Sequence, residues 1–428
     1  MAAGPEIVFV GDDFTGASDT LATLARAGRQ ARLYLDVPAP AQIVAADALG
    51  VATGLRAMAA EEIAAEMARM ASDLAALGAR FYHLKVCSTF DSSATVGSIG
   101  VSVNQLARTL RPALVAVIGG QPSLGRYCLF GTLFARAADG RTYRIDRHPV
   151  MATHPVTTMG EADLRLHLAP QGLDTLELVD LPALRAGPAA DLAADIAGRM
   201  RSGRTRLLFD AVETGDLVRI GAALRALATD RPILMVGASS VAEALVLSER
   251  ARPGDPEDGF VVPPLNGPTF VFAGSRSAVT ESQIEAAGRY LRIPLPAATV
   301  ADPVALAAAA AQCTAALRQS TNVLAHLVAA ERYGVSSGDL ARLSADFVRK
   351  VLAGVEVRRL GIAGGDTSSA VCRALDLSSI AFLADLDPGV ALCVGRAQTP
   401  ERDGIRLMLK GGQMGGATLY DRFANSIL

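Results

Sequence analysis

Two adjacent carboxylates near the start of the chain, Asp12 and Asp13, have the residue types and the setting for acid–base chemistry. They follow residues 7–10, a short β-branched run typical of a buried strand, and precede residues 21–28, a helical pattern that ends in glycine. In open α/β sheets, ligands bind at the carboxyl ends of the strands. One carboxylate is enough to cap a helix, whereas an adjacent pair also suits a hydroxyl, a metal or a cation. We therefore predict a site at this turn, with helix capping alone as the alternative.

Further polar side chains follow other predicted strands in the first half of the chain. Arg56 comes shortly after the apolar residues 48–52, and Lys85 ends the next β-like run, with Ser88 and Thr89 just beyond it. Arginine binds a carboxylate through two parallel hydrogen bonds, and lysine binds it as a point charge. These residues predict a site for a small, hydroxyl-rich anion. The alternative is that each charged side chain is simply exposed at a strand end.

In the second half of the chain, the predicted strands end in glycine-rich turns instead. The turns are residues 273–277, 363–369 and 410–416, and the first two lead into helical patterns. Glycine lets backbone N–H groups approach phosphate oxygens, and a helix N-terminus favours negative charge. None of the three is a Walker A or G-x-G-x-x-G sequence, so each alone is most often a tight turn. Three in one half of the chain predict a nucleotide site.

Carboxylates in one half and phosphate-binding turns in the other favour phosphoryl transfer. That reaction needs an acceptor hydroxyl, a carboxylate that takes its proton, and cationic or backbone groups with Mg²⁺ around the phosphates. We predict that Asp12 or Asp13 is the general base, and the sequence does not decide between them. ATP and Mg²⁺ are the predicted cofactors, and the ligands of the metal stay unassigned.

The order of the predicted elements indicates an α/β protein of two domains. Each domain is expected to be a mainly parallel sheet flanked by helices, because β-like runs alternate with helical patterns, and the active site is expected in the cleft between the domains. Residues 253–264 are rich in proline, glycine and acidic residues, which predicts a linker. The domains are then residues 1–252 for the substrate and 265–428 for ATP. Residues 123–155 interrupt the alternation and predict a β-hairpin, whose runs 127–134 and 142–145 flank an Asp-Gly turn.

Composition excludes several other classes of protein. The 428 residues are 50% hydrophobic with a net charge of −2, and no basic stripe predicts nucleic acid as a partner. No apolar run reaches the ~18 residues of a membrane helix, and the first residues lack the pattern of a secretory signal. The five cysteines are scattered and form no C-x-x-C motif, which favours reduced thiols. We expect a cytoplasmic protein with a small-molecule substrate, and the sequence is compatible with a homodimer.

Four segments together resemble the four-carbon acid sugar kinases. Residues 11–19 (GDDFTGASD) resemble the family's opening motif, and residues 85–92 (KVCSTFDS) are similar to its K-x-[DC]-S-T segment. Residues 364–368 (GGDTS) and 410–416 (KGGQMGG) are similar to its two later glycine motifs, with Gly, Gln and Met where the last usually has Ser, Asn and Phe. The segments occur in the family's order and span nearly the whole chain.

The resemblance implies ATP-dependent phosphorylation of the terminal hydroxyl of a four-carbon sugar acid. It implies a substrate-binding N-terminal domain and an ATP-binding C-terminal domain. The implied substrate contacts are Asp12, Arg56, Lys85, Ser88 and Thr89. The implied ATP contacts are Ser275, Gly364, Gly365, Asp366, Thr367, Gly412 and Gly415.

Within the family, residues 87–92 (CSTFDS) resemble the 3-oxo-tetronate kinase branch, which would form 3-oxo-tetronate 4-phosphate. Residues 123–155 do not match that branch, so D-threonate, D-erythronate and 3-oxo-isoapionate remain alternative acceptors. A non-catalytic sensor of sugar acids or nucleotides on the same frame is the alternative outside enzymes. The acidic pair argues against a sensor, because binding alone needs no base.

Overall fold

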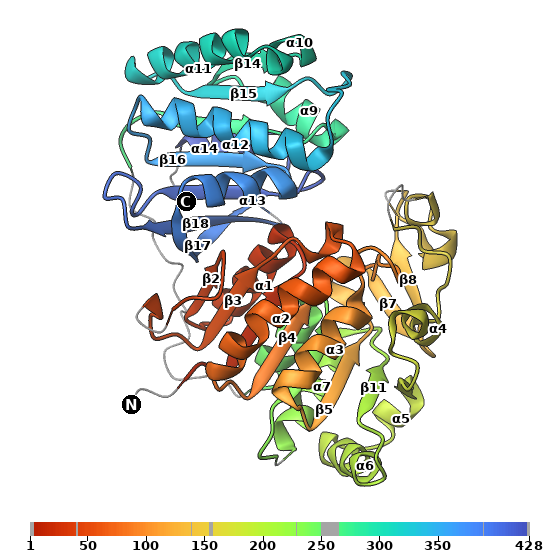
Figure 1. The fold of residues 1–428 in the computed structure, drawn as a ribbon. Helices are drawn as coiled ribbons and strands as arrows, with labels where there is room; N and C mark the ends of the chain where they lie inside the picture. Colours follow the sequence, from red (N-terminus) through yellow and green to blue (C-terminus); the bar gives the residue numbers. More distant parts are fainter. Residues whose placement is uncertain are drawn as a thin grey trace. The chain divides into compact units, whose positions relative to one another are not determined.

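The computed structural model describes residues 4–39, 42–137, 139–153, 157–227, 229–249, 265–387 and 389–425. The chain forms two compact units (Figure 1). The first comprises Met1–Ala31 and Asp36–Asp255, and the second Arg32–Leu35 and Pro256–Leu428. The predicted linker, residues 253–264, lies outside the described residues.

The first unit is built on a parallel sheet, as the alternation of patterns predicts. Its strands are buried runs rich in β-branched residues, which is typical of a parallel sheet covered on both faces. The order across the sheet is β10 (Glu177–Val179), β11 (Arg206–Phe209), β5 (Leu114–Ile118), β12 (Ile233–Gly237), β4 (Phe81–Lys85), β1 (Ile7–Gly11) and β3 (Ala48–Ala52).

Two groups of helices cover this sheet (Figure 1). In one group, α2 (Ala60–Ala76) packs on α3 (Ile99–Leu110). In the other, α1 (Phe14–Arg26), α8 (Ser240–Leu247), α7 (Thr214–Ala226) and α6 (Ala189–Arg201) contact one another in series. The short helices α4 (Leu164–Leu168) and α5 (Leu181–Arg185) complete the unit.

The second unit is also a mainly parallel sheet. Its order is β2 (Ala31–Tyr34), β17 (Leu377–Asp387), β18 (Val390–Ala397), β19 (Arg406–Lys410), β16 (Arg359–Ala363), β13 (Thr269–Ala273), β15 (Val323–Leu327) and β14 (Leu291–Leu295). The last five of these strands run parallel, whereas β17 and β18 are antiparallel to their neighbours. The predicted two-domain α/β class is therefore confirmed.

The helices of the second unit also form groups. Helices α11 (Pro303–Arg318), α12 (Ser337–Ala353) and α13 (Gly365–Ala374) contact in series, and α10 (Ala297–Ala301) packs on α11. The C-terminal helix α14 (Leu419–Asn425) contacts α9 (Ala278–Ala286) and β13. In the part of the chain that the structure describes, no helix is both long and apolar enough to cross a membrane.

The sequence pattern did not predict the position of β2. Leu33 and Tyr34 pair antiparallel with Ile380 and Ser379 of β17, so a short stretch from the first half of the chain belongs to the second unit. Strand pairing over such a sequence separation depends on tertiary contacts that periodicity does not reveal.

The interruption in the first unit is a small antiparallel sheet of β6 (Gly120–Gln121), β7 (Arg126–Leu129), β8 (Thr132–Arg136) and β9 (Thr142–Arg144). The expected hairpin around residues 137–141 joins β8 to β9. However, the run 127–134 is two strands rather than one. Phe130 (φ 51°) and Gly131 (φ 78°) turn the chain between them, and such left-handed pairs make the tight turns of hairpins.

A buried carboxylate holds that turn. Asp210, at the end of β11, accepts hydrogen bonds from the N–H groups of Phe130 (2.7 Å), Gly131 (2.9 Å) and Leu181 (3.0 Å). Its side chain is therefore used to fix the backbone of the small sheet, and burial raises the pKa of its carboxyl.

Replacing Asp210 by alanine is expected to lower the free energy of unfolding by about 2–4 kcal/mol, because three N–H groups, of which that of Gly131 is buried, lose their acceptor. Urea unfolding measures the change. Asp174→Ala is the matched control, since Asp174 is exposed and its side chain accepts no described hydrogen bond. Equal midpoints for the two variants would contradict this role.

Candidate active site

The turn after β1 places Asp12 and Asp13 in different roles. Asp13 is the N-cap of α1, and its Oδ1 accepts the N–H of Gly16 at 2.6 Å. The predicted alternative of helix capping is thus what Asp13 does. Asp12 takes no part in the cap, and its carboxylate is left for another partner.

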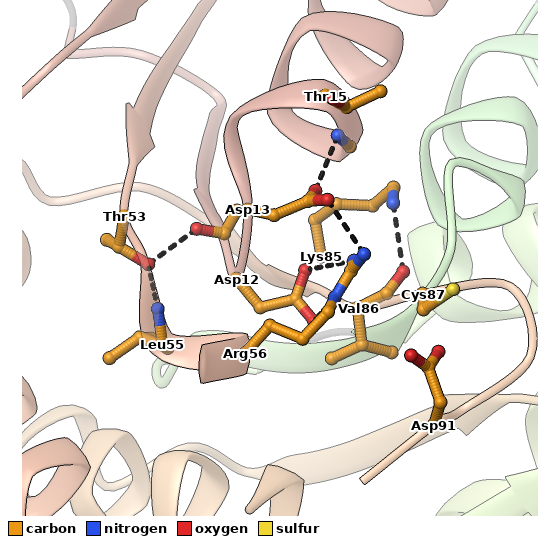
Figure 2. Close-up of polar contacts among 12 residues, drawn as sticks. Asp12, Asp13, Thr15, Thr53, Leu55, Arg56, Lys85, Val86, Cys87 and Asp91 are labelled. Atoms are coloured by element: carbon orange, nitrogen blue, oxygen red, sulfur yellow. Dashed lines mark hydrogen bonds and ion pairs between the residues drawn. The ribbon is translucent and has the colours of Figure 1, made fainter. Parts of the chain in front are cut away.

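That partner is Arg56, which lies in a short 3₁₀ turn (Leu55–Ala57) after β3. Figure 2 shows its guanidinium across both carboxylates. Nε and Nη2 donate to Oδ2 and Oδ1 of Asp12 at 3.1 and 2.8 Å, and Nη1 donates to Oδ2 of Asp13 at 2.7 Å. The bidentate geometry fixes the planes of guanidinium and Asp12 carboxylate against each other. The structure therefore brings three predicted site residues into one cluster.

Burial and charge oppose each other in this cluster. The side chain of Asp12 is 11% exposed and that of Arg56 is 25% exposed. Burial raises the pKa of Asp12, and the charge of Arg56 lowers it in part. The neighbouring carboxylates outweigh the burial of Arg56, so its pKa lies well above the usual value. Asp12 is consequently a more basic carboxylate than an exposed aspartate.

Lys85 ends β4 beside the same turn. Its register partner on β1 is Gly11, and the Nζ atom donates to the carbonyl of Val86 at 2.9 Å. Lys85 is buried, and among the described residues no carboxylate pairs with its ammonium. A Cβ atom on Gly16 would lie 2.6 Å from that Nζ, so the ammonium packs directly against the N-terminus of α1. Lys85 therefore adds positive charge next to the acidic pair, and its ammonium has N–H donors that no described residue uses.

The loop after β4 carries the predicted hydroxyls. Thr89 Oγ1 donates to Oδ1 of Asp91 at 2.8 Å and lies 3.0 Å from the Cys87 sulfur. The hydroxyl of Thr89 is thus used within the loop, whereas that of Ser88 is half-buried with no described partner. Burial raises the pKa of Cys87 to about 11, which keeps it a neutral thiol. Asp91, a residue without a predicted role, faces the cluster in Figure 2.

Two residues that the sequence did not predict as part of the site form hydrogen bonds with the loop after β4. His167 of α4 lies 3.0 Å through Nε2 from the Ser92 hydroxyl, and Gln171 Nε2 donates to the same hydroxyl at 2.9 Å. Both residues follow the small antiparallel sheet in the chain, so the conformation of the loop depends on that part of the unit. Nothing in the sequence indicated this contact.

In the second unit, six of the seven predicted ATP residues line one pocket of about 320 Å³. They are Ser275, Gly364, Gly365, Asp366, Thr367 and Gly412. Sequence reasoning missed the rest of the wall, which is mostly apolar or aromatic and includes Leu327, Tyr333, Val335, Leu340 and Ala341. These lie at the end of β15, in the loop after it or on α12, and carry no motif. Pockets with an apolar wall and a few polar groups are typical of nucleotide and cofactor sites.

The glycines in this pocket allow close approach of the loops. Gly364 has a φ of 119° and caps α13 without any side-chain hydrogen bond, which leaves the first N–H groups of that helix available. A Cβ on Gly274 would lie 2.3 Å from Thr367 Oγ1, and one on Gly412 would lie 2.6 Å from Ser275 Oγ. The three predicted turns therefore pack closely together at the N-terminus of α13, which no side chain caps. Such a helix N-terminus is a common binding site for phosphate.

Gly415 is the predicted ATP residue that does not line the pocket. A Cβ there would meet Leu419 at 2.8 Å, and its carbonyl accepts a hydrogen bond from Gln283. Among the described residues, no group of three or more His, Cys, Asp or Glu side chains forms a metal site.

Both halves of the chain match known domain families. Residues 7–245 match a sugar-binding N-terminal domain, and residues 270–419 match a nucleotide-binding C-terminal domain. A 3-oxo-isoapionate kinase of Paraburkholderia graminis is 35% identical, with 98% of this chain and 94% of the relative covered. A 3-oxo-tetronate kinase of Cupriavidus necator is 32% identical, with 98% and 97% covered.

A solved structure from Salmonella typhimurium LT2, described as a putative tRNA synthase, has the same fold. It superposes with a TM-score of 0.83 at 22% identity, covering 99% of this chain and 100% of that one. At this identity the likeness concerns the fold alone. By its two domain matches and its relatives, the chain belongs to the four-carbon acid sugar kinase family. The predicted family is confirmed, and so is an ATP-dependent kinase as the class of enzyme.

The cap at Asp13 can be tested through stability. Asp13→Ala is expected to lower the free energy of unfolding by about 1–2 kcal/mol, because the N-terminus of α1 loses its acceptor. Asp13→Asn should retain most of the stability, since asparagine is also a good N-cap. Chemical denaturation of both variants separates the two effects. Equal losses would show that the cap is not what Asp13 contributes.

Proposed function

We propose that the protein transfers the γ-phosphoryl group of ATP to the terminal hydroxyl of a small 3-oxo sugar acid. The observation that carries this proposal is the cluster of Arg56 with Asp12 and Asp13 next to Lys85, because it combines a basic carboxylate with two cations for an anionic acceptor.

Two acceptors have specific support. 3-Oxo-tetronate is supported by residues 87–92 and by the relative of that name at 32% identity. 3-Oxo-isoapionate is supported by the 35% identical relative and by residues 123–155, which depart from the 3-oxo-tetronate pattern. The two acids share a carboxylate and a 3-oxo group, so the same cations serve either.

In this proposal the acceptor's carboxylate competes with Asp12 for Arg56. Both are carboxylates, and the planar guanidinium offers each the same bidentate geometry. Lys85 has donors that the protein leaves unused, and these add to the attraction. Binding of the acid thus frees the carboxylate of Asp12 at the moment when a base is needed.

Asp12 is the residue that we assign as general base, and Asp13 is the cap. Asp13 is engaged on both oxygens by groups that shape the turn, namely the Gly16 N–H and Arg56. Asp12 has only Arg56, and its raised pKa suits a proton acceptor. Ser88, with its uncommitted hydroxyl, is assigned to the hydroxyls of the acid, and Thr89 shapes the loop through Asp91.

ATP is assigned to the pocket of the second unit, with its phosphates on the turns at Ser275, Gly364 and Gly412. Mg²⁺ is usually bound through phosphate oxygens and one or two carboxylates, and it supplies charge neutralisation on the transferred group. The proposal assigns it no protein ligand. Transfer further requires the two sites to face each other in the catalytic complex, which is the predicted cleft between the domains.

The proposal is tested by ADP release with Mg-ATP and a panel of 3-oxo-tetronate, 3-oxo-isoapionate, D-threonate and D-erythronate. We expect ADP release with one of the two 3-oxo acids and little with the threonate isomers. A sensor would bind the acid or the nucleotide without consuming ATP. Calorimetric binding with no turnover on any acid would therefore contradict the assignment.

Asp12→Asn is expected to lower kcat by ~10²–10⁴, because the variant cannot accept the proton of the acceptor. The matched control is Asp19→Asn in the same segment, since Asp19 accepts a hydrogen bond from Ser239 and does not contact Arg56. The control should keep nearly normal turnover. Similar kcat values for Asp12→Asn and the unmodified enzyme would exclude Asp12 as the base.

The pH profile gives an independent check. An ionised Asp12 is required, so kcat/KM should fall as the pH drops through its pKa, which burial raises above the usual value of about 3.9. The fall should begin at a higher pH than an exposed aspartate would give. The residual activity of Asp12→Asn should lack this acid limb, and an unchanged limb would assign it to another group.

A further inference from the structure

Lys410 is a buried lysine to which the proposed reaction assigns no role. It ends β19, directly before the glycine turn at residues 411–416, and it is 2% exposed. Its Nζ donates to the hydroxyl of Thr280 at 2.9 Å and lies 3.5 Å from the carbonyl of Gly412. In the described part of the chain, no carboxylate pairs with this ammonium. The chain has only three lysines, and two of them, Lys85 and Lys410, are buried at strand ends.

One face of α9 binds the carbonyl groups of the same turn. The hydroxyls of Ser277 and Thr280 both donate to the carbonyl of Gly412, the latter at 3.0 Å. Three residues further, Nε2 of the buried Gln283 lies within hydrogen-bond distance of the carbonyls of Met414, Gly415 and Gly416, at 3.0, 2.9 and 3.1 Å, so its two N–H donors are shared among three acceptors. The spacing of three residues puts the donors on one helix face.

These contacts set the direction of the N–H groups in the turn. In a trans peptide, the C=O and the N–H point in opposite directions. Binding the carbonyls of Gly412 and Met414 to α9 therefore directs the N–H groups of Gln413 and Gly415 away from α9. Among the described residues, neither N–H has an acceptor. Gly412 lines the nucleotide pocket and Gly415 does not, so the free N–H of Gln413, next to Gly412, is the one suited to phosphate oxygens.

We propose that Lys410 is a positioning residue for the nucleotide phosphates: together with Thr280 and Gln283, it holds the carbonyls of the turn against α9 so that the N–H of Gln413 faces the phosphates. The ammonium also places a fixed positive charge beneath the turn. This inference rests on the proposed function, because it assigns the phosphates to this pocket.

The charged residues on neighbouring elements leave Lys410 without a counter-ion. Arg359 and Arg406 are the first residues of β16 and β19 and pair in register, whereas Lys410 is the last residue of β19. Both arginines therefore lie at the far ends of these strands from Lys410. The remaining charged residues on the elements packed around Lys410 are Glu281 and Glu285 on α9, Asp366 and Arg373 on α13, and Arg396 on β18. Burial is what lowers the pKa of Lys410, to about 8. Since the protonated form attracts phosphate, nucleotide affinity should fall as the pH rises through that value.

Calorimetric titration with ADP and with Mg-ATP tests the role of Lys410 directly. Lys410→Met removes the charge at similar length, and we expect the Kd for nucleotide to rise on the order of 10- to 100-fold at pH 7. The decline in affinity above pH 8 should also disappear, which a purely structural role would not produce. Lys350→Met is the matched control, because Lys350 is an exposed lysine on α12 of the same unit.

A second pair of variants decides the case if Lys410→Met does not fold. Thr280→Val removes the hydroxyl that joins Lys410 to Gly412 and should weaken nucleotide binding, whereas Thr280→Ser keeps the hydroxyl and should bind normally. Nucleotide affinity within twofold of the unmodified protein in Lys410→Met, or in Thr280→Val where Lys410→Met is unfolded, would overturn the inference.

The titration uses no acceptor, so the two proposals fail in different ways. Lys410-dependent nucleotide binding without ADP release on any acid would contradict the acceptor assignment and leave this inference standing. Normal turnover together with nucleotide binding that does not depend on Lys410 would contradict this inference and leave the proposed kinase function standing.

Discussion

The first unit depends on one guanidinium that two neighbouring carboxylates share. Arg56 binds Asp12 through two hydrogen bonds and Asp13 through one, at the point where β1 meets α1. The backbone also joins these residues, because the N–H of Arg56 donates to the carbonyl of Asp12 at 3.0 Å. An ion pair of this kind is strong in a partly buried site, and a carboxylate that replaced Asp12 on Arg56 would leave Asp12 without its cation. In the proposed mechanism, Asp12 stays paired with Arg56 until the carboxylate of the acceptor binds.

In the second unit, glycine residues and helix α9 together fix the conformation of three turns. Glycine at residues 274, 364 and 412 removes the Cβ atoms that would collide with Thr367 and Ser275. The polar face of α9 then binds the carbonyls on the far side of the last turn. The contacts with α9 hold the flexible glycine turn in one conformation. Such preorganisation reduces the conformational entropy that is lost when a ligand binds.

Strand-end residues were predictable because the parallel register of β1, β3 and β4 brings residues 11, 52 and 85 to one edge. Asp12, Arg56 and Lys85 could thus be placed together from sequence, and the glycine turns likewise. Other features depend on long-range contacts that periodicity does not encode. The pairing of β2 with β17, the fold of residues 127–134 into two strands, and the support of Ser92 by His167 belong to this group. The sequence also did not show which of Asp12 and Asp13 caps α1, because only the geometry of the turn distinguishes them.

The most direct test of the account is a crystal structure of the enzyme with a 3-oxo sugar acid and a non-hydrolysable ATP analogue. The distance to measure is that from the Arg56 guanidinium to the carboxylate of the acid. The account predicts that Arg56 is within hydrogen-bond distance of the acid and that the freed carboxylate of Asp12 contacts the terminal hydroxyl. An acid bound elsewhere, with Arg56 still bidentate on Asp12, would contradict it.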